Sequence, residues 1–128
     1  MNSNFDKSNL LELVGFNANI LCAHWRAGSA SSNEHSVLGS LYSELGGYID
    51  AFVEGTLGAL GSRDLGGSTN LKIHSEPTTA SSEALIAYGL KLVGGLESEL
   101  DAKEDSGLMN ILADMKNSLV KAKYLLEL

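Results

Sequence analysis

The chain has 128 residues, and its 9 Lys and Arg against 16 Asp and Glu give a net charge of -7. This length predicts one domain, residues 1–128, with enough apolar surface for a core. The acidic balance and the lack of a basic arm argue against nucleic acid as a partner, and no apolar run approaches the roughly 18 residues of a membrane span. The single cysteine, Cys22, excludes an intrachain disulfide and a cysteine-based zinc site, so we expect a protein of the reducing cytoplasm.

Apolar residues recur at helical spacing through the first half of the chain. The first stripe predicts a helix over residues 6–27 that ends at Gly28. The next segment, Ser31-Ser32-Asn33-Glu34, has the capping-box pattern of a helix start. A second helix is therefore predicted over residues 32–61.

A long connection divides the chain into two halves. Residues 62–78 contain a glycine cluster and the only proline, and they predict a loop long enough, at about 3.3 Å per residue, to run the length of a bundle. Two further helices are predicted over residues 79–103 and 106–127, with a tight turn at Asp105-Ser106-Gly107. The sequence thus predicts an all-α, ferritin-like four-helix bundle of two antiparallel helical hairpins joined by a long crossover loop.

Four polar residues on the first hairpin are candidate metal ligands. His24 lies near the end of the first predicted helix and His35 near the start of the second, so the hairpin should bring the two imidazoles together. Asp50 and Glu54 are spaced i, i+4 and project side by side from the second helix. Two imidazoles and two carboxylates are a ligand set for iron, zinc or manganese.

One chain cannot close a site from these four residues. His35 and Asp50 are separated by about 22 Å along one helix, whereas every ligand must lie within about 2.2 Å of the metal. A second chain related by a two-fold axis brings its Asp50 and Glu54 opposite the first chain's histidines. The axis would pass a group of small residues that allow close helix approach, Ser40, Ser43, Gly46 and Gly47.

The ligand pattern carries a family resemblance. The pair His24-Trp25, followed by His35, Asp50 and Glu54 at these spacings, resembles the Dps-type mini-ferritins, and most closely the short phage-encoded members. The resemblance implies a ferroxidase centre at a dimer interface, with His24 and His35 from one subunit and Asp50 and Glu54 from its mate. It extends to the last helix through Asn110-Ile111-Leu112 and Lys121-Ala122-Lys123-Tyr124-Leu125-Leu126.

The resemblance also implies a substrate, an assembly and a location. Fe(II) would be oxidised to Fe(III) by peroxide or oxygen, and iron stored if the chain forms a dodecameric shell, in the host cytoplasm for a phage protein. Asp101, Glu104 and Asp105 would line its pores. The chain departs from the family at Gly39, where many members have an Asp, and it lacks the Lys-rich tail used for DNA binding, so DNA protection is not implied.

Plainer interpretations stand beside these. A buried histidine is most often a satisfied core or capping residue, two exposed carboxylates are most often a solvated helix face, and Trp25 is expected to anchor the core rather than to take part in redox chemistry. His74, in the predicted loop, has no partner at ligand spacing. The alternatives to an iron oxidoreductase are therefore a metal-binding protein without turnover and a purely structural helical assembly protein.

Overall fold

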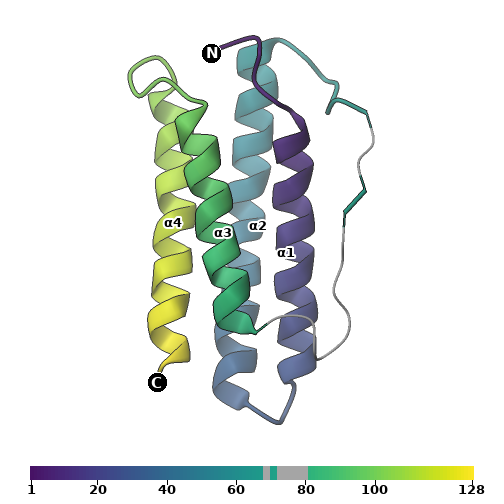
Figure 1. Ribbon diagram of the computed structural model, residues 1–128, viewed down its shortest axis with the longest axis vertical. Coiled ribbons are helices and arrows are strands. Elements are labelled where there is room, and N and C mark those ends of the chain that lie inside the picture. The colour runs from purple at the N-terminus through teal and green to yellow at the C-terminus, as the bar shows by residue number, and fades with distance from the viewer. Residues whose placement is uncertain (68–69, 72–80) are drawn as a thin grey trace.

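Four long helices make up the protein. The computed structural model describes residues 1–67, 70–71 and 81–128, and none of these residues lies in a strand. The helices confirm the predicted all-α four-helix bundle (Figure 1), and their bounds are α1 Ser8–Ala27, α2 Ser32–Leu60, α3 Ser82–Ser98 and α4 Ser106–Leu126.

The helices pack as a square. α1 contacts α2 and α3, and α4 contacts the same two helices, so α1 lies diagonally opposite α4. α2 ends at the opposite end of the bundle from the start of α3 (Figure 1), and these two helices therefore run in the same direction. The side chain of Leu71 lies against Gly15, which puts this part of the connection along α1. Residues 68–69 and 72–78 of the predicted loop, which include His74 and Pro77, lie outside the described residues.

Local hydrogen bonds explain where α2 begins and ends. The Ser31 side chain accepts a bond from the Glu34 amide at 3.4 Å, which is one half of the predicted capping box. At the other end Gly61 has φ +66°, and the amides of Gly61 and Ser62 bond back to carbonyls of the last turn. This left-handed ending favours glycine and stops the helix one residue before the predicted end.

The third helix is shorter than predicted. It ends at Ser98 instead of 103, because Asp101 accepts bonds from the amides of Lys103 and Glu104, and Asp105 accepts one from the Asp101 amide. Side chains that bond to nearby backbone amides in this way replace the helical pattern with a turn. The predicted turn at Asp105-Ser106-Gly107 is accordingly wrong, since α4 already begins at Ser106.

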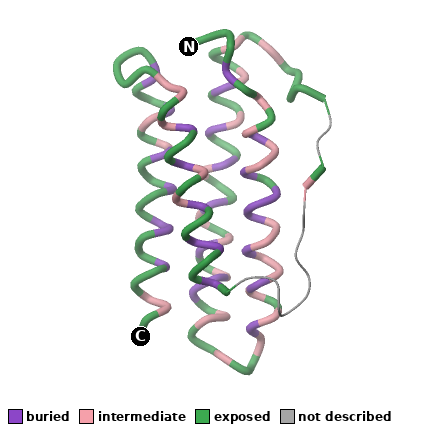
Figure 2. The backbone as a smooth tube through the Cα atoms, viewed as in Figure 1, coloured by how far each residue is buried: buried purple, intermediate pink, exposed green. Residues whose placement is uncertain are grey.

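Each helix buries one face (Figure 2), as the stripes predicted. Between α1 and α3 the Phe16 ring, which is 4% exposed, lies directly on the backbone of Gly89, and a side chain larger than hydrogen at 89 would overlap it. The most deeply buried side chains include Leu10, Ile20, Leu38, Leu45, Phe52, Ile86, Leu96, Leu112, Met115 and Leu119.

None of the helices in the described part of the chain is both long and apolar enough to span a membrane.

Candidate functional site

The α1–α2 turn brings His24 and His35 into direct contact. Their imidazole rings are stacked, with centroids 3.8 Å apart and planes inclined by 17°. The two residues come from different helices, one from the last turn of α1 and the other from the first turns of α2. The expectation that the hairpin joins the two imidazoles is therefore confirmed.

Reciprocal hydrogen bonds fix both rings. Nδ1 of His24 lies 2.6 Å from the carbonyl oxygen of His35, and Nδ1 of His35 lies 2.8 Å from the carbonyl oxygen of His24. A carbonyl oxygen can only accept, so both Nδ1 atoms carry a proton, and in the neutral imidazole each Nε2 then has the lone pair. A ring N–H that bonds to a backbone carbonyl is the usual support of a histidine that binds metal through its other nitrogen.

The same bonds also complete the end of α1. The His24 carbonyl belongs to the last turn of the helix, where the C-cap residue Gly28 supplies its backbone donor. It accepts the His35 imidazole N–H, and the Gly28 amide approaches it at 3.4 Å. His35 is thus a C-terminal cap of α1 as well as a candidate ligand.

The ring planes restrict what the pair can bind. A metal ion bound to an imidazole lies close to the plane of that ring, along the lone pair of the nitrogen. Planes that are nearly parallel, on rings with centroids 3.8 Å apart, do not meet at one ion about 2 Å from both nitrogens. In this arrangement each Nε2 can bind an ion of its own, and the two rings do not chelate a single ion.

The carboxylates lie elsewhere on α2. Asp50 and Glu54 are exposed, and neither shares a cluster with the histidines of its own chain. Among the described residues no group of three or more His, Cys, Asp or Glu side chains is placed to hold a metal. Any site that uses all four residues must take its carboxylates from a second chain, as the distance along the helix predicts.

Histidine and carboxylates nevertheless share one face of α2. Positions three or four apart in a helix lie on the same face. Such a series, in steps of three or four residues, runs through His35, Gly39, Ser43, Gly46, Asp50 and Glu54.

A hollow of about 430 Å³ lies beside this face, between α1 and α2. Asp50 is part of its lining, and the buried Asn17 donates from Nδ2 to the carbonyl oxygen of Tyr42 at 3.3 Å, while its Oδ1 has no hydrogen-bond partner among the described residues. This buried acceptor could not be predicted from the sequence, because Asn17 lies in register with an apolar stripe. The rest of the lining is mainly apolar or small, Val14, Ala18, Leu21, Gly46, Ile49 and Val53.

Two residues differ from their expected surroundings. Trp25 is 63% exposed, so the expectation that it anchors the core is wrong; it follows His24 on α1 and turns away from the buried stripe. Glu34, expected to complete the capping box, accepts a short hydrogen bond from the Ser82 hydroxyl instead and so joins the start of α2 to the start of α3. This contact between distant segments has no signal in the local sequence.

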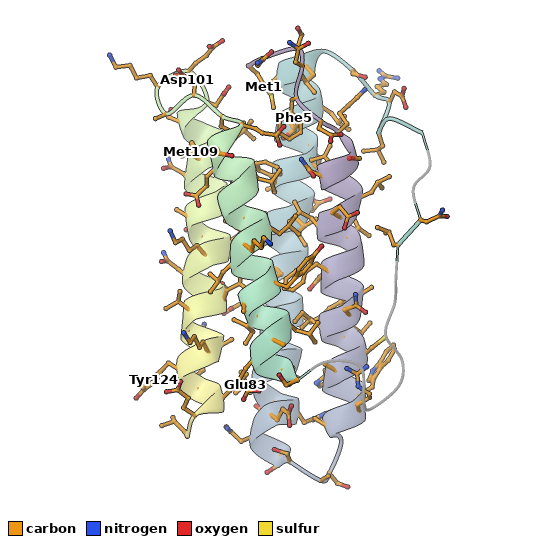
Figure 3. The ribbon with its side chains drawn as sticks, in the orientation of Figure 1. Met1, Phe5, Glu83, Asp101, Met109 and Tyr124 are labelled. Carbon is orange, nitrogen blue, oxygen red and sulfur yellow. The ribbon has the colours of Figure 1, made fainter. Side chains whose placement is uncertain are left out.

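The acidic residues proposed for a pore lie in the α3–α4 turn, at the same end of the bundle as the N-terminus (Figure 3). Asp105 is only 7% exposed, and its carboxylate accepts from the Asp101 amide and lies 3.5 Å from the amine of Met1. Glu104 is exposed and accepts from the same amine at 2.7 Å. The Asp105 carboxylate therefore stabilises the turn. Of the three acidic residues predicted to line a pore, only Asp101 and Glu104 lie at the surface.

Comparison with known proteins yields no relative: no family model, no curated protein and no solved structure matches the chain.

Proposed function

We propose that the protein binds Fe(II) between two copies of itself and oxidises it to Fe(III), in the manner of the Dps-type mini-ferritins that its ligand pattern resembles. His24 and His35 of one subunit and Asp50 and Glu54 of the partner subunit form the site. The observation that carries the proposal is the His24–His35 pair, whose Nδ1 atoms both donate to carbonyl oxygens, an arrangement that leaves the Nε2 of each neutral ring to bind metal.

The shared face of α2 supports the role of a second chain. A two-fold axis near Ser43 and Gly46, perpendicular to the helix, pairs each position near the start of the face with one near its end. His35 then faces Glu54 of the partner subunit. The apolar hollow between α1 and α2 supplies surface that a second subunit would bury, and the small side chains at Ser43 and Gly46 permit close approach.

The ligand types suit the proposed chemistry. The imidazoles are neutral ligands, while the carboxylates add the negative charge that favours Fe(III) over Fe(II). Two Fe(II) ions each lose one electron, and one hydrogen peroxide accepts both electrons with two protons and leaves as two water molecules. Because the two imidazoles do not converge on one ion, each can serve one of the two Fe(II) ions.

Mixed dimers test the shared site. His35→Ala and Asp50→Ala should each bind Fe(II) much more weakly as homodimers, although the two residues lie about 22 Å apart along α2. In a mixed dimer one interface site collects both changes and the other regains all four ligands. In an anaerobic Fe(II) titration the mixed dimer should therefore show about half of the wild-type binding capacity. When oxygen or peroxide is added, it should also consume about half as much oxidant as the wild type.

Asp114→Ala is the matched control, because Asp114 is an exposed helical aspartate on α4, away from the proposed interface. It should bind Fe(II) as the wild type does. A mixed dimer confirmed by mass that binds no more Fe(II) than either homodimer contradicts the shared site.

A structural function is the second candidate, and the same histidines favour it. His35 caps the end of α1 and stacks on His24, which by itself would justify both residues in a protein that binds no metal. Metal content separates the two candidates: a wild-type protein that folds and assembles but takes up no Fe(II), Zn²⁺ or Mn²⁺ supports the structural function. Binding without oxidation supports a metal-binding protein without turnover.

A further inference from the structure

The His24 ring lies against Gly39, a position of α2 without a side chain. Gly39 is one turn after His35, and a Cβ at this position would be 2.7 Å from Cε1 and 2.9 Å from Nδ1 of His24. Contacts this short do not occur between such atoms, so any larger residue at 39 must displace the ring. The ring occupies the space in which the side chain of residue 39 would begin.

Three contacts therefore hold the His24 imidazole. The Gly39 backbone supports it, the His35 ring stacks on it, and the His35 carbonyl accepts its Nδ1 proton at 2.6 Å. Displacement by a side chain at 39 would act on the other two contacts at once. The direction of the free Nε2 lone pair depends on all three.

We infer that Gly39 is a positioning residue, which seats the His24 imidazole so that its Nε2 is presented for metal binding. The inference rests on the proposed function. It also accounts for the departure at this position from the resembled family, since a carboxylate cannot occupy residue 39 while the ring is seated there. With no acid at 39, the proposed site draws its carboxylates from Asp50 and Glu54 of the partner subunit.

Other glycines in the helices do not share this role. A Cβ at Gly58 of α2, or at Gly94 of α3, meets nothing within 4 Å. At those positions alanine adds helix propensity and touches no side chain. Gly39→Ala and Gly94→Ala thus make the same chemical change in two helices, and only the first reaches an imidazole.

The test measures ring position and metal affinity separately. In nitrogen NMR of the metal-free wild type, the His24 ring should show a protonated, hydrogen-bonded Nδ1 and an unprotonated Nε2. Gly39→Ala should lose this signature for His24, and its affinity for Fe(II), titrated without oxygen, should fall by about tenfold or more, while its helical circular dichroism is retained. Gly94→Ala should keep both the signature and the wild-type affinity.

The same substitution in a protein that already carries His24→Ala tests for a general effect on folding. With His24→Ala already present there is no ring to displace, so adding Gly39→Ala should raise thermal stability as a helix alanine does. Gly39→Ala with wild-type affinity for Fe(II) overturns the inference and leaves the proposed function standing. A wild-type protein that binds no Fe(II) overturns the proposed function and this inference with it, even if the ring signature responds to Gly39→Ala.

Discussion

The contact between Phe16 and Gly89 predicts that one substitution has opposite effects at two positions of α3. Gly94 is exposed, and a Cβ added there has no described atom within 4 Å outside its own helix. Alanine at this position should stabilise the protein by up to about 1 kcal/mol, because alanine is the better helix former. At Gly89 the same gain is opposed by overlap with the Phe16 ring, which is 4% exposed and packs against Tyr88 with ring centroids 6.0 Å apart. Because the ring is buried, its displacement disturbs the packing around it, and overpacking of this kind costs about 1–3 kcal/mol.

Gly89→Ala should therefore lower the free energy of unfolding by about 1 kcal/mol and differ from Gly94→Ala by about 2 kcal/mol. For a chain of this length 1 kcal/mol corresponds to about 4 °C in Tm, so thermal unfolding followed by circular dichroism should separate the two variants by about 8 °C. Phe16→Leu, added to Gly89→Ala, removes the tip of the ring and should reduce the cost of the alanine. Equal stabilisation by the two alanines would refute the reasoning.

Three further predictions concern the hairpin, the surface and the partners. His35→Ala removes the cap on the His24 carbonyl and should lower the free energy of unfolding by about 1–2 kcal/mol in urea titrations; an unchanged midpoint would contradict the capping role. Hydrogen bonds from Lys121 and Ser118 lower the pKa of the Glu44 carboxyl, so its stabilising contribution is full above the ordinary range for Glu and is lost as pH falls through the lowered folded-state pKa. Glu44→Gln should accordingly flatten the acid limb of a plot of urea midpoint against pH, and a limb as steep as that of the wild type would count against the ion pair. At about 0.15 M salt the acidic chain should leave duplex DNA unretarded in a gel-shift assay, and a retarded band would show a binding surface that the charge balance does not predict.

The helices follow from the sequence because each has a continuous apolar stripe on one face. The end of α3 does not, because it depends on the carboxylates of Asp101 and Asp105 bonding to backbone amides within the turn. Residues 99–103 can be helical by propensity, and those side-chain bonds decide against it. The sequence also did not predict the exposure of Trp25. A large apolar residue next to an apolar stripe is usually buried, but Trp25 lies outside the packed face of α1.

The candidate site is predictable in part. Topology alone joins His24 to His35, since a short turn leaves no other place for the ends of two antiparallel helices. The stacking and the exchanged hydrogen bonds are not encoded in that spacing. They depend on the open backbone at Gly39, whose fit to an imidazole appears only in three dimensions. The proposed contribution of Asp50 and Glu54 cannot be seen in a single chain, because the proposal requires a second subunit.

Every residue of the proposed centre lies on the α1–α2 hairpin, in the continuous stretch 24–54, and the α3–α4 hairpin supplies no ligand. A gene that encodes the four-helix chain twice, with a linker long enough to let the second copy pack against the first, would carry both halves of the proposed site in one polypeptide. In such a fusion each copy can be altered independently, so the histidines can be kept in one half and the carboxylates in the other. In the proposed dimer, two-fold symmetry duplicates the site. The fusion could remove this symmetry and keep a single centre, with the histidines and the carboxylates on two hairpins that can be altered separately.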